Sequence, residues 1–306
     1  MESFIREKAR ELGFSACGFT DCSDLLSEQS LFEQWLSEGR QADMAYLERH
    51  MDIRFHPSLL AEGCTYVVVA LLNYHRPESA LASNSAYKVA EYAWGMDYHK
   101  VMREKLHALA QCIQGLSKGV RTRCCVDTAP VLEKALAIRA GLGWRGKNSL
   151  LVTEQGSKYF IGEVFTSLPL RSDTPQANAC GSCTACVEAC PASALSETGT
   201  LDARRCLSYQ TIERKNLLLP VGIQGAQGEA VFGCDACQNA CPYNREAPVT
   251  QVAEFLQDPP WTSWTDADWQ SLRAADFERY FADSALQRIG YEKLMENIRS
   301  VSMRDA

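Results

Sequence analysis

The feature that most constrains this chain is a run of cysteines with the spacing C-x2-C-x2-C-x3-C-P. The run consists of Cys180, Cys183, Cys186 and Cys190, followed by Pro191. Bacterial ferredoxins that carry two clusters hold 4Fe-4S centres with this spacing. A tight loop supplies three converging thiolates, and the fourth, followed by a proline that redirects the chain, points toward the neighbouring cluster. The run therefore predicts iron–sulfur chemistry.

A second set of cysteines repeats the C-x2-C-x3-C-P ending. It consists of Cys234, Cys237 and Cys241, and Cys206 precedes them by a long insertion. By the ferredoxin crossover, these eight thiolates fit two clusters with none left over. The predicted ligands are Cys180, Cys183, Cys186 and Cys241 for the first cluster, and Cys190, Cys206, Cys234 and Cys237 for the second.

Zinc is the alternative occupant, because paired C-x2-C motifs often bind it. We expect clusters instead, because zinc-site spacings lack the three-cysteine run and the x3-C-P ending. The other six of the fourteen cysteines lie in apolar segments and are expected to be small buried side chains. They are Cys17, Cys22, Cys64, Cys112, Cys124 and Cys125.

Composition bounds the cellular setting. The net charge of −7 argues against a protein coated with nucleic acid along its length, although it leaves room for a local patch. The N-terminus mixes acidic with basic residues and has no apolar signal-peptide core, and the longest apolar run, 66–72, is too short to cross a bilayer. We expect a cytoplasmic protein with no membrane partner, in which many cysteines indicate metal or redox chemistry.

Helical and strand patterns alternate over the first part of the chain. Apolar residues recur at helical spacing in residues 3–13 and 97–117. Residues 16–20 are strand-like, and residues 65–74 are so uniformly apolar that they predict a buried central strand. This alternation predicts an α/β domain over residues 1–171.

Two further local patterns fall within that domain. Residues 120–140 predict a strand followed by a helix, with Pro130 in the first helical turn. Residues 150–165 predict a hairpin that turns at Gln155 and Gly156.

The composition changes at about residue 172, where a polar, proline-containing linker begins. Residues 172–248 contain the eight predicted ligand cysteines and are expected to form a ferredoxin-like domain. Residues 249–306 are expected to form a short helical region in which Trp261, Trp264 and Trp269 pack together.

Two other features bear on chemistry. Gly141, Gly143 and Gly146 match G-x-G-x-x-G, but they follow a predicted helix and precede a strand, so a helix stop and turn is favoured over a dinucleotide site. The loop still offers a group of hydrogen-bond donors able to bind a large polar cofactor.

Asp127 follows a predicted strand, where it is either a helix cap or an acid facing a cleft, and the residues leave both interpretations open.

Eight segments taken together resemble the epoxyqueuosine reductase family, whose members use cobalamin in the last step of queuosine synthesis in tRNA. They span about residues 40–248 in the family's order. The segments are MAYLERHMDIRFHPSLL, YAWGMDYHKVMREKL, VDTAPVLEKALA, GLGWRGKNSLL, FIGEVFTSLPL, CGSCTACVEACPASAL, CLSYQTIERK and FGCDACQNACPYNREAP.

The resemblance implies an α/β cobalamin-binding domain followed by a ferredoxin-like domain with two 4Fe-4S clusters. It also implies that the clusters reduce the bound cob(II)alamin to a nucleophilic cob(I) state and that Asp127 is the proton donor to the departing oxygen. We therefore expect burial over the apolar corrin face to raise the pKa of Asp127. The implied cobalamin contacts are Arg54, Tyr98, Asp127, Arg145, Lys147, Asn148, Ser149 and Ser208.

The implied substrate is tRNA that carries epoxyqueuosine in its anticodon stem-loop. Many family members continue into helical HEAT-like repeats that help to hold tRNA, whereas this chain stops at Ala306, so we expect a smaller or differently placed tRNA surface. Residues 118–171 carry a local charge of +5, with nine basic and four acidic residues, and Arg214 and Lys215 are expected to extend this patch toward phosphate. We expect a monomer that receives electrons from an unidentified low-potential donor.

Two other functions compete with this interpretation. Reductive dehalogenases also join cobalamin to two such clusters, but they normally carry a twin-arginine export signal, which is not visible here. The other alternative is a non-catalytic iron–sulfur module that transfers electrons to a flavoprotein.

Overall fold

The computed structural model describes residues 1–216, 223 and 225–302. The N-terminal part is built on a sheet of four antiparallel strands, in the order β1-β2-β7-β4. Their bounds are Ala16–Asp21 for β1, Tyr66–Asn73 for β2, Thr122–Cys125 for β4 and Tyr159–Thr166 for β7. Strand β2 lies between β1 and β7 and is buried from Val67 to Asn73, so the prediction of a buried central strand is confirmed.

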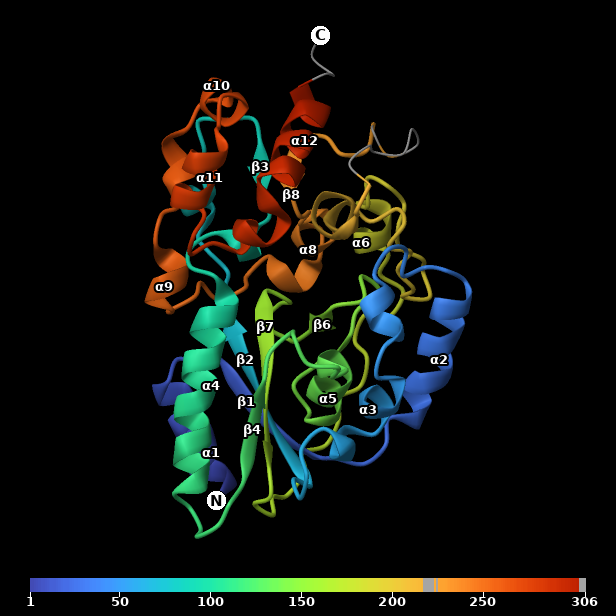
Figure 1. The fold of residues 1–306 in the computed structure, drawn as a ribbon. Helices are drawn as coiled ribbons and strands as arrows, with labels where there is room; N and C mark the ends of the chain where they lie inside the picture. Colours follow the sequence, from blue (N-terminus) through green and yellow to red (C-terminus); the bar gives the residue numbers. More distant parts are fainter. Residues whose placement is uncertain (217–222, 224, 303–306) are drawn as a thin grey trace.

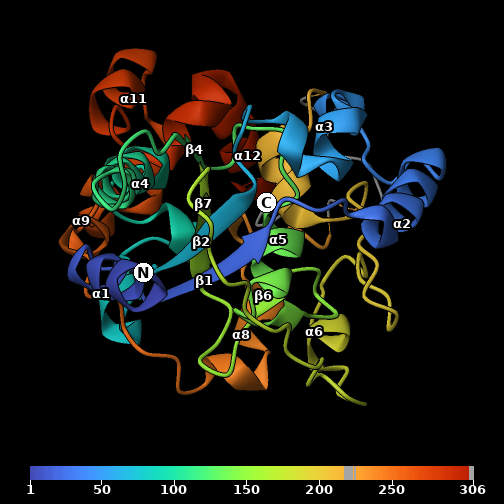
Figure 2. The same ribbon diagram turned by 90° about the horizontal axis from the view of Figure 1, so that it is seen from below.

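Helices cover both faces of this sheet, as Figures 1 and 2 show. On one face, α1 (Glu2–Glu11) and α4 (Tyr98–Gln114) form a core with Val68, Ala70 and Leu72 of β2. On the other, α5 (Glu133–Arg139) forms a core with Val67, Val69 and Leu71. Alternate side chains of a strand point to opposite faces, which explains why β2 is apolar at every position. Helices α2 (Leu26–Ser37) and α3 (Met51–Phe55) lie on the side of α5.

The helix after β4 begins later than predicted. Pro130 does not lie in the first helical turn, because α5 begins only at Glu133. The intervening loop holds Asp127 in the left-handed region, with φ +52°, and the Asp127 backbone N–H donates to the Glu133 carboxyl at 2.5 Å. A loop, not a helix end, therefore presents Asp127.

The hairpin predicted over residues 150–165 is also wrong. The chain does reverse at the predicted turn, where Thr153 pairs with Gly156. However, β6 (Leu151–Val152) pairs with β5 (Trp144–Arg145) and not with β7. Strand β7 is inserted between β2 and β4, where both of its neighbours supply backbone partners.

The glycine loop before β5 is a helix stop, as the sequence favours. Gly141 adopts φ +69° directly after α5 ends, a conformation that costs glycine little. Gly143 permits a close approach, because a Cβ there would lie 2.2 Å from the carbonyl oxygen of Val152.

The segment that holds the predicted cluster ligands contains little regular structure. The one-turn helices α6 (Ala185–Glu188) and α8 (Ala236–Asn239) each carry one predicted ligand, Cys186 and Cys237. Strand β8 (Ala230–Phe232) pairs in parallel with β3 (Lys88–Val89), so this segment joins the N-terminal part through its backbone. The remaining short turns are η1 Ala45–Glu48, η2 Pro57–Leu59, η3 Glu78–Leu81, η4 Glu91–Ala93, η5 Tyr209–Glu213 (a π-turn), η6 Pro242–Asn244 and η7 Pro260–Ser263.

The C-terminal part is helical, as predicted. Trp261 and Trp269 are buried and Trp264 packs against them, so the predicted aromatic cluster is confirmed. Tyr87 and Trp94 from the N-terminal part join the same core. The elements are α9 Ala253–Leu256, α10 Asp266–Gln270, α11 Ala274–Tyr280, η8 Ala285–Ile289 and α12 Gly290–Ser302. No helix in the described part of the chain is long and apolar enough to span a membrane.

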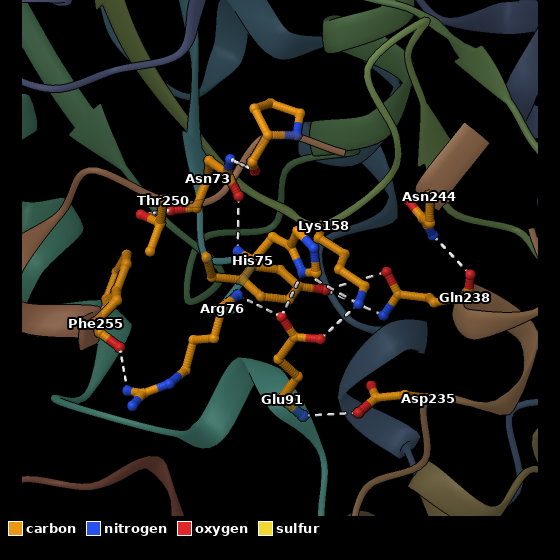
Figure 3. Close-up of polar contacts among 12 residues, drawn as sticks. Asn73, His75, Arg76, Glu91, Lys158, Asp235, Gln238, Asn244, Thr250 and Phe255 are labelled. Atoms are coloured by element: carbon orange, nitrogen blue, oxygen red, sulfur yellow. Dashed lines mark hydrogen bonds and ion pairs between the residues drawn. The ribbon is translucent and has the colours of Figure 1, made fainter. Parts of the chain in front are cut away.

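A buried ionic network fastens the cluster segment to the sheet (Figure 3). The Glu91 carboxylate, 3% exposed, contacts His75 Nδ1 at 2.7 Å and Lys158 Nζ at 2.5 Å, and accepts the Arg76 backbone N–H at 2.6 Å. The Glu91 backbone N–H donates at 2.7 Å to Asp235, which lies between two predicted ligand cysteines. Burial raises the pKa of Glu91, but the hydrogen bonds from His75 and Lys158 outweigh it and the net pKa is lowered. The carboxylate is therefore charged and neutralised in place.

The same end of β2 also contacts Gln238 of the cluster segment and the chain that follows this segment. Gln238, four residues past Cys234, accepts a hydrogen bond from Tyr74 at 3.1 Å. The Thr250 hydroxyl donates to the Asn73 carbonyl, and the buried Arg76 guanidinium donates to the Phe255 carbonyl. The position of the cysteine loops therefore depends on residues of the sheet.

Removing the Glu91 carboxylate tests this network. Glu91→Ala leaves Lys158 buried and without its opposite charge, so we expect the free energy of unfolding to fall by about 3–5 kcal/mol. Urea unfolding followed by tryptophan fluorescence measures it. The control is Lys88→Ala, which breaks the exposed Lys88–Glu229 pair and is expected to cost less than about 1 kcal/mol. Equal losses in the two variants would contradict this account of the network.

Candidate active site

A cleft of about 310 Å³ opens where the sheet, the cluster segment and the C-terminal part meet. Both Asp127 and the predicted cluster ligand Cys206 line it. The wall is largely aromatic and apolar. Its other residues are Met44, Tyr46, Tyr92, Tyr98, His99, Leu201, Ala203, Ser208, Tyr209, Ile212, Glu213, Phe232, Ala285 and Arg288.

Three donors converge on one oxygen of Asp127. Oδ2 accepts the Tyr98 hydroxyl at 2.9 Å and lies 3.0 Å from both His99 Nε2 and a terminal nitrogen of Arg288. The N-cap of α5 is Leu132, so Asp127 is not the cap of that helix. Of the two interpretations that the residues left open, the acid in a cleft is the one that the structure supports.

The expectation that burial over a corrin face raises the pKa of Asp127 stays a prediction, and the contacts of Asp127 within the chain act in the opposite direction. Burial does raise the pKa of this carboxyl, but the hydrogen bonds from His99, Tyr98 and Arg288 outweigh burial and hold it well below its ordinary value. For His99 the balance has the opposite result: burial lowers its pKa, whereas its contacts with Asp127 and Asp97 raise it to about 9. At neutral pH the site therefore holds an anionic Asp127 against a cationic His99.

His99 and Arg288 contact Asp127 in the cleft, and sequence reasoning assigned neither of them a role in the site. His99 stands two residues after Asp97, the N-cap of α4, whose side chain accepts the His99 backbone N–H. The pattern D-x-H at a predicted helix start was therefore an available signal. Arg288 is 161 residues from Asp127 and lies in η8, so no local pattern links the two.

The predicted cobalamin contacts fall into two groups. Tyr98 and Ser208 line the cleft with Asp127. Arg54 is buried and does not line it, but its guanidinium donates to the carbonyls of Arg49 at 3.2 Å and Tyr46 at 3.1 Å. Arg54 therefore holds the turn that carries Tyr46.

The loop from Arg145 to Ser149 is not part of the lining of this cleft. Arg145 is exposed and lies 3.9 Å from Glu28, and Lys147 is half-buried. Asn148 and Ser149 are buried, and the Ser149 hydroxyl donates to the carbonyl of Gly199 at 2.9 Å. In this structure the loop braces the cluster segment.

Of the two predicted tRNA contacts, Arg214 is buried and Lys215 is exposed. The Lys215 backbone N–H donates to Asp43 at 3.2 Å. The Lys215 side chain lies at the surface, next in sequence to residues 208–213, several of which line the cleft.

The predicted ligand cysteines form two neighbouring groups. Burial raises the pKa of the Cys186 thiol, and Cys241, Cys180 and Cys183 lie close enough to raise it further. In the same way, burial raises the pKa of Cys234, with further contributions from Cys206 and Cys190. Cys237 also lies close to Cys206 and Cys234. Cys237 also lies close to Cys186 of the other set, and among the described residues no group of three or more His, Cys, Asp or Glu side chains is arranged to hold a metal ion, so the two sets stay a prediction.

The six other cysteines are less uniform than expected. Cys22, Cys64 and Cys125 are buried, whereas Cys17, Cys112 and Cys124 are half-buried. Burial raises the pKa of Cys22 and Cys125 to about 12, as expected for inert packing thiols.

Comparisons with known proteins agree with this geometry. Residues 54–128 match the family model described as epoxyqueuosine reductase QueG, DUF1730, and residues 179–244 match a 4Fe-4S double cluster binding domain. An epoxyqueuosine reductase of Aliivibrio fischeri is 41% identical over 99% of this chain and 82% of its own length. The chain belongs to the epoxyqueuosine reductase family. The fold class and the two 4Fe-4S clusters predicted from the sequence are thereby confirmed.

Solved structures of epoxyqueuosine reductases have the same fold. The Streptococcus thermophilus enzyme matches with a TM-score of 0.86 and 29% identity, over 98% of this chain and 80% of that one. An epoxyqueuosine reductase with a tRNA-Tyr epoxyqueuosine-modified stem loop matches with a TM-score of 0.89 and 28% identity, over the same shares. A catabolic reductive dehalogenase matches with a TM-score of 0.51 and 16% identity, over 98% of this chain and 35% of that one, so it shares the fold alone. The dehalogenase alternative is not favoured.

Removing Arg288 tests the electrostatics around Asp127. An opposite charge at this distance lowers a carboxyl pKa by about 1–3 units, so Arg288→Ala should raise the pKa of Asp127 by about that amount. Carboxyl 13C NMR titration measures it. Arg273→Ala, which removes an exposed arginine paired with Asp276, is the control and should leave Asp127 unchanged. An unchanged pKa of Asp127 in Arg288→Ala would contradict the conclusion that Arg288 lowers this pKa.

Proposed function

We propose that this chain reduces epoxyqueuosine to queuosine in tRNA, with cobalamin and two 4Fe-4S clusters as its cofactors. The observation that carries the proposal is the cleft itself, because a predicted cluster ligand, Cys206, and an acid, Asp127, line the same space. Electrons and a proton can therefore reach one substrate group. The printed function of the relatives and the modified stem loop bound to one of them support the same substrate.

The residues of the cleft fit a cobalamin. Tyr46, Tyr92 and Phe232 provide aromatic surface for a macrocycle, and Tyr98 and Ser208 provide hydroxyl groups for its polar rim. When bound, as cob(II)alamin in the resting enzyme, the cofactor would supply a strongly reducing cobalt centre. We propose that residues 1–171 hold it, with the loop of Arg145, Lys147, Asn148 and Ser149 contributing at its periphery.

The two cluster groups differ in exposure. Cys183 of the first group is exposed, whereas Cys206 of the second lines the cleft. We propose that residues 172–248 carry electrons from a low-potential donor, which meets the first cluster, to the second cluster and then to the cleft. Cytoplasmic location and a monomeric chain complete this proposal, and the helical part from residue 249 contributes Arg288 to the site.

The reaction balance defines what the cleft must supply. Converting an epoxide to an alkene breaks both C–O bonds, forms one C=C bond and releases the oxygen as water. It consumes two electrons and two protons per substrate. Asp127 is the residue placed to pass protons to the oxygen, since its carboxylate faces the cleft and its loop is held by Glu133.

The tRNA substrate has to present one unstacked base to the cleft. Single-stranded loops are recognised in this way, with bases splayed out against aromatic side chains. We propose that Lys215 contacts phosphate beside the cleft and that the buried Arg214 holds the chain at this point. A surface with few phosphate contacts should lose affinity only gradually with added salt.

Turnover by an Asp127 variant tests the chemistry. The anaerobically reconstituted chain is incubated with a stem-loop that carries epoxyqueuosine, and nucleosides are measured by mass spectrometry. Asp127→Asn should retain both cofactors and lose about 10²–10⁴-fold in rate, the usual contribution of a positioned acid. Asp52→Asn, at an exposed position outside the cleft lining, should retain the wild-type rate.

Retained turnover in Asp127→Asn would remove the acid role from this residue. A wild-type chain that binds no cobalamin, judged from its visible spectrum, would instead favour the non-catalytic electron-transfer module.

The iron content tests the cluster assignment. Two 4Fe-4S clusters correspond to about eight iron and eight sulfide per chain. Anaerobic reconstitution followed by iron and sulfide analysis should reach these values, and Cys206→Ser should lower both by about half. Stoichiometric zinc without cluster absorbance would falsify the assignment.

A further inference from the structure

Behind the acid of the cleft lies a continuous row of three side chains. His99 Nδ1 is 2.8 Å from Asp97 Oδ1, and His99 Nε2 is 3.0 Å from Asp127 Oδ2. The imidazole is therefore bonded at both nitrogens, each time to a carboxylate. The side chains of His99, Asp97 and Asp127 are 13%, 23% and 40% exposed, so the imidazole is shielded between two carboxylates that both reach solvent.

The ring of His99 is held rigidly. The Tyr98 ring stacks on it with a centroid distance of 4.0 Å, and the Tyr98 ring itself stacks on Phe160 at 4.2 Å. The Tyr98 hydroxyl shares Asp127 Oδ2 with His99. His99 thus has one orientation, in which a proton on Nε2 points at the acid.

Among the described residues, charged groups from several elements lie near the imidazole, and they include Glu133 at the start of α5, which interacts electrostatically with it. Asp97 at the start of α4 and Asp127 in the β4–α5 loop face it directly, Arg288 of η8 reaches it through Asp127, and Lys100 pairs with Asp283 beside the Asp97 cap. The two carboxylates outweigh burial and raise the pKa of His99 to about 9. An imidazole that donates to two carboxylates carries a proton on each nitrogen.

We propose that His99 is a positioning residue that holds a proton against Asp127 and transfers it from Nε2 to Oδ2 when the cleft is filled. The inference rests on the proposed function, because the reaction consumes two protons and a single carboxyl delivers one at a time. His99 supplies Asp127 with the proton that the substrate oxygen takes.

The transfer changes no net charge. The Nε2–H bond of His99 breaks and an O–H bond forms on Asp127, so a charged pair becomes a neutral pair. Filling the cleft with apolar surface removes water, which penalises the charged forms and favours the neutral pair. Arg288 retains a carboxylate partner after this step, because it also lies 3.8 Å from Glu213.

The first test requires no cofactor chemistry. The imidazole of His99 is titrated by 15N NMR in the intact chain with oxidised clusters, with its signal assigned from His99→Gln. We expect a pKa near 9 in the wild type and a fall of at least about one unit in both Asp97→Asn and Asp127→Asn. Titration of His99 near its ordinary 6.5 in the wild type would overturn the proposal.

The second test separates proton supply from a merely structural role. His99→Gln keeps a polar side chain of similar reach but cannot titrate, and Tyr98→Phe removes a hydrogen bond to the same oxygen without removing a titrating group. In single-turnover assays from pH 6 to pH 10, the wild-type rate should fall above pH 9. Tyr98→Phe should lower the rate and keep this alkaline limb, whereas His99→Gln should lower the rate at pH 7 at least about tenfold and lose the limb.

An alkaline limb that persists in His99→Gln at an unchanged rate would refute the proposal. Failure of the wild-type chain to convert the epoxyqueuosine stem-loop would refute the proposed function instead, and the NMR titration would still decide whether His99 holds a proton against Asp127.

Discussion

The arrangement of this molecule depends on the ion pair and hydrogen bonds of the buried Glu91 carboxylate. Its charge is neutralised by Lys158, which directly precedes β7, it also contacts His75, and its own backbone N–H donates to Asp235 inside a ligand loop. A charge in an apolar interior is costly unless it is paired, so the sheet and the cluster segment have one favourable relative position. The cleft exists because these two parts are fixed against each other.

That fixed position brings two chemistries to one place. Cys206 approaches the cleft from the cluster segment, and Asp127 approaches it from the end of β4. The aromatic wall between them lowers the local dielectric constant, which strengthens each charge interaction inside. In the mechanism proposed above, the anionic Asp127 is surrounded by Tyr98, His99 and Arg288 and receives its proton across one hydrogen bond from His99.

The sequence carried some of this information and not the rest. Spacing alone was enough to predict two 4Fe-4S clusters in the cysteine-rich segment, because cubane ligation imposes a strict local pattern. The uniformly apolar β2 was recognisable, since a strand between two cores has no polar face. The insertion of β7 between β2 and β4 was not, because pairing depends on contacts distant in the chain, and the helix pattern after Pro130 gave no sign that a loop would present Asp127.

The candidate site was also only partly predictable from the sequence. Asp127 was identifiable through resemblance, but the direction of its pKa depends on donors that only the fold assembles. Arg288 comes from the C-terminal part, and His99 reads in isolation as an ordinary helix residue. From the sequence, loop residues such as Asn148 are predicted to donate hydrogen bonds to a ligand. In the structure Asn148 is buried.

The central claim is that the electron path through Cys206 and the acid Asp127 serve one bound cofactor. Electron paramagnetic resonance of the chain loaded with cob(II)alamin tests it most directly, because a reduced cluster beside the cleft carries a spin that couples to the cobalt. Reducing the clusters should broaden or split the cob(II)alamin signal, and Cys206→Ser should weaken this effect. A cob(II)alamin signal that is identical with oxidised and with reduced clusters would contradict it.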